Sequence, residues 1–177
     1  MRKVVGVSDL KVSANEHEEI ITHALGSCLG ITVYDPVAKV GGMVHVMLPL
    51  AKSDPVKAKA KPAMYVDTGF GKLLNEVYEL GAQKKNLEII VAGGASMKKN
   101  KDDDYFKIGK RNFTVLRKLL WKNGFMISSQ DVGGSTSRTM VLSIADGLVT
   151  INKQPINDVN RSTGISVGAA FNHQVAI

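Results

Sequence analysis

The chain has 177 residues, 44% of them hydrophobic and 22% charged, which is typical of an ordinary globular protein with a packed core. Its apolar runs are too short, or too interrupted by glycine and histidine, to span a bilayer, and no signal-like apolar stretch follows its basic start. We therefore expect a cytoplasmic protein that is not inserted in a membrane. Its single cysteine excludes an internal disulfide, and no cluster of His and Cys surrounds it to form a structural zinc site.

The net charge of +7 comes largely from lysines, which are dense at 52–61 and again at 98–101. Such a surface favours acidic partners through electrostatic steering. Nucleic acid is the obvious alternative partner. The basic stretches have no interleaved aromatic residues and no nucleic-acid module signature, so we expect no nucleic-acid binding.

The first third of the chain predicts short strands. Residues 4–12 are β-like, and residues 29–34 form an apolar strand that ends at an Asp-Pro turn signal. A Gly-Gly pair then opens a second strand at 43–48. The short link between these two strands predicts a hairpin. The following segment, 51–61, is polar and rich in Lys, Ala and Pro, so we expect an exposed loop.

Two helices are predicted. Apolar residues recur at helical spacing over 62–80, with a proline in the first turn and a glycine as the stop. The second helix is expected at 112–123, with Asn112 as its N-cap and Gly124 closing it. Between them, 87–92 is a continuous apolar run that predicts a buried strand.

Further strands are expected at 125–132, 139–144 and 148–152, with a loop at 93–107 and no assignment beyond Pro155. The total is about seven strands and two main helices, with consecutive hairpins. We therefore expect an α+β fold with a mixed sheet, and one domain spanning residues 1–177.

Cys28 lies between two glycines in Leu25-Gly26-Ser27-Cys28-Leu29-Gly30. Glycines on both sides leave the backbone uncrowded and allow conformations that other residues avoid, so a carbonyl substrate can approach the sulfur. Backbone N–H groups near Ser27 and Cys28 could then point at a developing oxyanion. The alternative is a small buried apolar cysteine.

A thiol attacks as the thiolate and needs a base, and His45 is the best-placed histidine. It lies in the second strand of the predicted hairpin, on the face of two methionines, and a hairpin could bring it opposite the Cys28 end of the first strand. We expect the opposite face, with two valines and a leucine, to be the core-like one. His23 has an odd offset from Cys28 and should face away, while His17 is expected in solvent and His173 near a loose tail. A satisfied interior histidine is the alternative.

Thr22 is a candidate for orienting that base. It precedes Cys28 by six residues, an even offset that places both on one strand face if the segment stays extended. Its hydroxyl could accept a hydrogen bond from the ring nitrogen of His45 that does not serve the sulfur. The alternative is an ordinary strand threonine.

Taken together, these motifs resemble the CheD family, the chemoreceptor glutamine deamidases of bacterial and archaeal chemotaxis. The resemblance spans nearly the whole chain, in order, through Thr22-x-x-Leu25-Gly26-Ser27-Cys28, Tyr34-Asp35-Pro36, Gly41-Gly42-Met43-x-His45-x-Met47-Leu48-Pro49, Tyr65-Val66-Asp67, Gly93-Gly94-Ala95, Ile108-Gly109-x-x-Asn112 and Asp131-x-Gly133-Gly134-x-x-x-Arg138.

The resemblance implies a protein-glutamine glutaminase that converts selected receptor glutamines to glutamate. The resemblance makes Cys28 the nucleophile, His45 the base and acid, and Thr22 the orienting residue. From the residues themselves, we expect the backbone at Gly26 and Ser27 to face the oxyanion. It further implies a mixed β-sandwich flanked by helices, related to a bacterial toxin deamidase, with no metal or cofactor. The implied partners are the cytoplasmic domains of methyl-accepting chemoreceptors and a CheC-type phosphatase of the response regulator, which docks on the deamidase.

Two positions depart from the family pattern: Lys110 stands where an acidic residue is expected, and Ser137 where a glycine commonly precedes the arginine. Both could alter partner docking or loop geometry. The rival functions are a mainly non-catalytic docking protein that stimulates the phosphatase, and a redox sensor built on Cys28, which would lack a resolving cysteine.

Three weaker motifs are interpreted structurally. Gly93-Gly94-Ala95-Ser96 lacks the lysine of a phosphate loop, so a tight turn is expected. Residues 133–138 could cradle an anion, although a plain turn with an exposed arginine is at least as good. Asp102-Asp103-Asp104 lacks the ligand spacing of a calcium loop and is expected to be a solvated acidic tip.

Overall fold

The protein is described here from a computed structural model that covers residues 1–96, 107–155 and 172–175. Two five-stranded sheets form its framework. The central sheet has the order β2 (Leu10–Ser13), β5 (Val40–Val46), β4 (Leu29–Asp35), β6 (Glu88–Gly93) and β7 (Ser129–Val132). The outer sheet has the order β1 (Arg2–Val5), β3 (Glu19–Leu25), β8 (Thr136–Ser143), β9 (Val149–Pro155) and β10 (Asn172–Val175).

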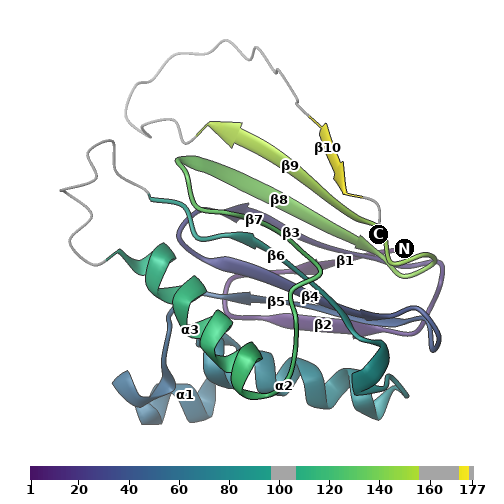
Figure 1. The fold of residues 1–177 in the computed structure, drawn as a ribbon, viewed down its shortest axis with the longest axis horizontal. Helices are drawn as coiled ribbons and strands as arrows, with labels where there is room; N and C mark the ends of the chain where they lie inside the picture. Colours follow the sequence, from purple (N-terminus) through teal and green to yellow (C-terminus); the bar gives the residue numbers. More distant parts are fainter. Residues whose placement is uncertain (97–106, 156–171, 176–177) are drawn as a thin grey trace.

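The helices cover one face of the central sheet, and the outer sheet covers its other face (Figure 1). The helices are α1 (Pro55–Ala60), α2 (Val66–Glu79) and α3 (Ile108–Lys122), with short 3-10 turns η1 (Ala51–Ser53), η2 (Pro62–Met64) and η3 (Lys84–Asn86). None of the helices in the described part of the chain is long and apolar enough to cross a bilayer. The α+β class is therefore confirmed, and the layers run helices, central sheet, outer sheet.

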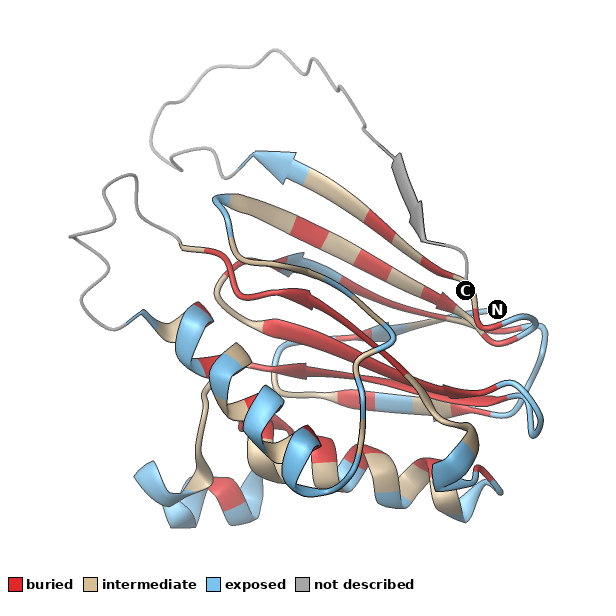
Figure 2. Ribbon diagram, viewed as in Figure 1, coloured by how far each residue is buried: buried red, intermediate tan, exposed pale blue. Residues whose placement is uncertain are grey.

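Two hydrophobic cores follow from this layering. One lies between the helices and the central sheet, and the second lies between the two sheets. Every residue of β4 and β5 is buried, whereas buried and half-buried residues alternate along β8 (Figure 2). The prediction of one core-like face for the His45 strand is wrong for this reason, since both faces of β5 are packed.

Helix α2 is amphipathic in the way the sequence predicts. Val66, Phe70, Leu73 and Val77 recur at intervals of three and four residues, and all are buried against the central sheet. The helix ends before Gly81, whose φ of +104° is a left-handed conformation that suits glycine. It begins at Val66 rather than at Pro62, because residues 62–64 form the separate turn η2.

The loop predicted at 51–61 is wrong, since the segment contains η1 and the helix α1. Asp54 caps α1 by accepting a hydrogen bond from the Lys57 N–H at 3.0 Å, and Pro55 occupies the first turn. Ala58 packs with Met64 and Tyr65. A short lysine-rich segment thus becomes helical because it has a cap and one buried contact.

The strand predictions hold in part. The hairpin is confirmed, with β4 and β5 antiparallel and Gly30 opposite His45. The strand expected at 4–12 is instead two strands in different sheets, with Ser8 at φ +61° in the turn between them. The strand expected at 125–132 begins only at Ser129, and β3 was not predicted as a complete strand.

Candidate functional site

The chain crosses from the outer sheet to the central sheet between β3 and β4, and Cys28 lies in this crossing segment. Thr22 is on β3 of the outer sheet, and His45 is on β5 of the central sheet. Cys28 and Met43 both pack into the core between the sheets, which is the face of β5 that also carries His45. All three predicted residues therefore border the inter-sheet layer, where Thr22 contacts His45 directly and Cys28 packs into the same core without a hydrogen bond to the His45 ring among the described residues.

The crossing segment, residues 26–28, is held by its carbonyl groups. The Gly26 oxygen accepts a hydrogen bond from the Ala95 N–H at 2.8 Å, and the Cys28 oxygen accepts one from the Gly94 N–H at 2.8 Å. Between them, the Ser27 oxygen accepts from Asn112 Nδ2 at 3.1 Å. Three successive carbonyl oxygens are thus engaged, which fixes the backbone that carries the sulfur.

Unlike its carbonyl oxygens, the N–H groups of Ser27 and Cys28 in this segment are not held by backbone hydrogen bonds: in the described part of the chain, they donate none to another backbone group. Backbone donors next to the sulfur are therefore available for a developing negative charge.

Thr22 sets the proton position on His45. The Thr22 hydroxyl lies 2.8 Å from the Val5 carbonyl oxygen, to which it donates its one proton. The same Oγ1 is 2.8 Å from His45 Nδ1, so it must accept from Nδ1–H there. We therefore assign the tautomer with Nε2 unprotonated. Nε2 has no hydrogen-bond partner within the described residues, which leaves a buried lone pair.

Burial keeps the Cys28 thiol and the His45 ring neutral. His45 is 1% exposed, and burial lowers its pKa to about 4. Burial also raises the pKa of the Cys28 thiol, although the contact with its own N–H lowers it in part. At neutral pH the resting pair is a thiol and an imidazole, not a thiolate and an imidazolium.

The glycine argument for the Cys28 segment needs correction. Neither Gly26 nor Gly30 has a positive φ. Gly30 is required for packing, because a Cβ there would lie 2.8 Å from the Leu25 side chain and 3.1 Å from Met140 Sδ. The demanding glycine is Gly93, at φ +110°, where a Cβ would lie 2.1 Å from the Cys28 oxygen.

The spacing argument for Thr22 is also wrong, although its contact with His45 is confirmed. The β3 register shifts between Thr22 and Leu25, and Ala24 has a φ of +55°, so the segment up to Cys28 is not one extended strand. The contact arises because the two sheets face each other. His23 is exposed, as the odd offset predicted, and so is His17, while the side chain of His173 is not described.

Asn112 is the residue whose role was missed. It was expected to cap a helix, but α3 begins at Ile108 and Asn112 is fully buried. Its Nδ2 donates to the oxygens of Ser27 at 3.1 Å and Met47 at 3.0 Å, so it ties the Cys28 segment to the end of the His45 strand. The available signal was its place at intervals of four residues before Leu116 and Leu120, a polar residue on the buried stripe.

The weaker motifs also find structural roles. Residues 93–95 form the turn that holds the Cys28 segment, as described above. Arg138 is buried, contrary to the exposed arginine expected, and it pairs with Asp131 at 2.9 Å, which also binds Lys153. Residues 102–104 lie outside the described residues. Within the described ranges, no three His, Cys, Asp or Glu side chains are grouped to hold a metal ion.

Comparison with known proteins gives a consistent result. Residues 47–153 match the family model described as CheD chemotactic sensory transduction. The chain is 44% identical over 148 residues to the Syntrophus aciditrophicus protein named "Probable chemoreceptor glutamine deamidase CheD 1", covering 84% of this chain and 91% of that protein. It is also 44% identical to similarly named proteins of Solibacter usitatus, with 81% and 84% covered, and of Pyrococcus abyssi, with 84% and 90% covered.

Proposed function

This chain belongs to the CheD family, and from that premise we propose that Cys28, His45 and Thr22 carry out its reaction. Its relatives are named probable chemoreceptor glutamine deamidases, and deamidation of a glutamine hydrolyses its side-chain amide to give glutamate. The protein is thus a protein-glutamine glutaminase acting in chemotaxis.

The observation that carries the residue assignment is the hydrogen-bond chain from His45 Nδ1 through Thr22 to the Val5 oxygen. It leaves Nε2 as an unprotonated base without a partner among the described residues, on the inter-sheet face of β5, where the cysteine also packs. A histidine that served only packing would have no need of a fixed tautomer with a bare lone pair.

The first half of the reaction forms a thioester. His45 Nε2 takes the thiol proton while the sulfur attacks the glutamine δ-carbon, and backbone N–H groups at Ser27 and Cys28 receive the oxyanion. The carbon–nitrogen bond then breaks. The imidazolium returns its proton to the leaving nitrogen, and ammonia departs.

The second half regenerates the enzyme. His45 takes a proton from water, and the hydroxide adds to the thioester carbonyl. The carbon–sulfur bond breaks, the sulfur regains a proton, and the product glutamic acid ionises. Because Thr22 holds Nδ1–H throughout, the same nitrogen, Nε2, handles every proton transfer.

Ammonia release from a purified chemoreceptor cytoplasmic domain tests this assignment. Cys28→Ala should abolish release while its circular dichroism matches the wild type, whereas the surface control Val37→Ala, in the β4–β5 turn, should remain fully active. Mass spectrometry should locate the converted glutamines. Undiminished release by Cys28→Ala would refute the nucleophile.

Several finer features rest on the family resemblance alone. We propose that the protein works in the cytoplasm as one deamidase domain over residues 1–177, with a fold related to the toxin-type cysteine deamidases. We also propose that a CheC-type phosphatase binds it as a heterodimer. Size-exclusion chromatography of the two purified proteins, mixed and separate, tests the heterodimer, and two unshifted peaks would contradict it.

A further inference from the structure

Helix α3 presents an exposed face that is basic along its length. Between Ile108 and Lys122 there is no Asp or Glu, and five residues are Lys or Arg. Its exposed residues recur at intervals of three and four, which places them on one side of the helix. We call five of these exposed residues the α3 stripe: Lys110, Thr114, Arg117, Lys118 and Trp121.

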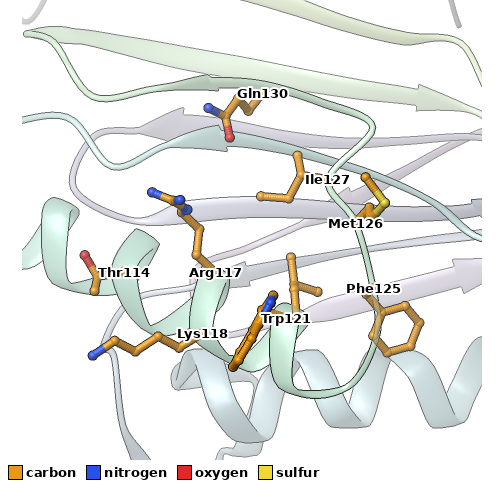
Figure 3. Close-up of a pocket in the computed structure, with 9 residues that line it drawn as sticks. Thr114, Arg117, Lys118, Trp121, Phe125, Met126, Ile127 and Gln130 are labelled. Atoms are coloured by element: carbon orange, nitrogen blue, oxygen red, sulfur yellow. The ribbon is translucent and has the colours of Figure 1, made fainter.

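The C-terminal end of the stripe borders a groove of about 790 Å³ (Figure 3). Trp121 and Met126 are 85% and 84% exposed on its walls, an unusual exposure for two large apolar side chains. Leu120, which is buried in the core, also lines it. None of the nine lining residues is acidic, and two are basic.

The cations of the stripe have no carboxylate partners among the described residues. Elsewhere on the surface, lysines do pair, as in Lys39 with Glu16 and Lys72 with Glu76. Lys110 also lies in the first turn of α3, where a positive charge opposes the helix dipole. Among the described residues no carboxylate neutralises these three charges, although Arg117 lies over the Phe113 ring at 5.9 Å, so their charge can act on a partner.

The α3 stripe begins beside the Cys28 segment. The first turns of α3 carry Asn112, whose side chain binds the Cys28 segment, and Trp121 lies nine residues further along, about 14 Å at the rise of an α-helix. Figure 1 shows α3 running from the edge where β3 passes into β4 and out along the helical layer. An elongated ligand lying on the stripe would therefore extend from the groove toward the site.

We infer that the α3 stripe is a docking site for an acidic amphipathic helix of the substrate receptor, outside the segment that carries the glutamine. This rests on the proposed function. An apolar side chain of the receptor helix enters the Trp121–Met126 groove, and its carboxylates lie over Arg117, Lys118 and Lys110. Charge disfavours a second copy of this chain as the occupant, because the chain carries +7 and its stripe has three cations and no acidic residue.

Binding can be measured without chemistry, because Trp121 is the only tryptophan. In a Cys28→Ala background, titration with the receptor cytoplasmic domain should shift the tryptophan emission. The apparent Kd should weaken as salt rises, since the contacts are exposed ion pairs. Emission that is unchanged at saturating receptor, or that shifts with the concentration of this protein alone, would overturn the inference, the second result because it indicates self-association.

Kinetics separates docking from catalysis. Trp121→Ala and the double variant Arg117→Glu/Lys118→Glu should each raise KM for the receptor domain by roughly tenfold while kcat stays near the wild-type value. Val37→Ala, an exposed apolar residue in the β4–β5 turn, is the matched control and should change neither. An unchanged KM in both groove variants refutes the docking site even if deamidation is normal. Receptor binding with no ammonia release refutes the proposed function instead.

Discussion

Helix α3 connects the Cys28 segment with the α3 stripe, yet the polar groups of the two regions differ in burial, charge and hydrogen bonding. In the Cys28 segment three consecutive carbonyl oxygens are hydrogen-bonded, and the half-buried Cys28 thiol and the buried His45 ring of β5 are both neutral. In the stripe all five side chains are exposed, and its three cations have no carboxylate partner in the described residues. Asn112 and Trp121 lie on the same helix, one inside each region.

The difference separates two tasks of an enzyme that acts on a protein. A rigid, neutral pair sets the rate of the chemical step, because positioning and proton transfer are fixed before the substrate arrives. An exposed charged surface affects encounter and affinity. Changes in the Cys28 segment should therefore act on kcat and stability, and changes in the stripe on KM and its salt dependence.

The largest effect should come from the base. His45→Gln removes the Nε2 lone pair, and kcat for receptor deamidation should fall on the order of 10³-fold. KM should change little, because the residue lies inside the inter-sheet layer rather than on the docking surface. Steady-state ammonia release measures both constants. A His45→Gln variant with a raised KM and a normal kcat would contradict the separation of catalysis and docking between the two regions.

The neutrality of His45 predicts a pH dependence of stability. The unfolded chain binds a proton at His45 below pH about 6.5, whereas the folded protein resists protonation until about 4. Stability is therefore intact above pH 6.5 and declines as the pH falls toward 4, by roughly 3 kcal/mol in total from this group.

Urea unfolding between pH 7 and 4 measures this decline. His45→Gln should flatten the curve between pH 6.5 and 4.5, leaving the carboxylates, whose losses come at lower pH. A wild-type curve already flat over that range would show that His45 titrates normally in the folded protein.

Gly93→Ala should be severely destabilising. A Cβ at this position meets the Cys28 oxygen at 2.1 Å, and the φ of +110° is unfavourable for alanine. We expect a loss on the order of 3 kcal/mol in unfolding free energy. Gly71→Ala is the matched control, because a Cβ there, in helix α2, meets nothing within 4 Å, and it should leave stability equal or higher. Equal stability of the two variants would show that the close approach of residue 93 to the Cys28 oxygen does not matter for stability.

Asn112→Ala should cost roughly 1–3 kcal/mol, since it removes the donor to two part-buried carbonyl oxygens. It should also lower kcat, because the Asn112 side chain no longer links the Cys28 segment to the end of β5 through its two hydrogen bonds. Asn123→Ala removes an exposed side-chain bond at the other end of α3 and serves as the comparison. Thermal unfolding and ammonia release report both effects, and an Asn112 variant with normal kcat would show that the tie is only structural.

Thr22→Val should have the smallest effect, about tenfold in kcat, because it frees the tautomer without removing the base. Thr22→Ser keeps the hydroxyl and should recover most of the rate. NMR of the His45 ring nitrogens checks the cause: the valine variant should lose the preference for Nδ1–H, and an unchanged tautomer would mean that Thr22 acts otherwise.

Local pattern accounts for much of the fold. The β4–β5 hairpin, α2 and β6 follow from periodicity and turn residues, because those signals depend on neighbours in the chain. Periodicity does not say which sheet a strand joins. It therefore missed that β5 is covered on both faces, and that β1 and β2 separate into different sheets.

The candidate site likewise divides into features that local sequence predicts and features that depend on tertiary packing. Cys28 and His45 could be selected by residue type and context, whereas the contact between Thr22 and His45 depends on two sheets packing face to face. Asn112 was misplaced because a polar residue before an apolar run resembles a helix cap, and only its tertiary contacts show that the helix starts earlier.

Acid-quench mass spectrometry during turnover tests the central claim most directly. With the receptor cytoplasmic domain as substrate, the peptide containing Cys28 should carry a covalent adduct equal to the glutamine-bearing peptide less one ammonia, and hydroxylamine should remove it. Deamidation that proceeds with this peptide unmodified at every quench time, or with the adduct on another residue, would contradict a thioester on Cys28.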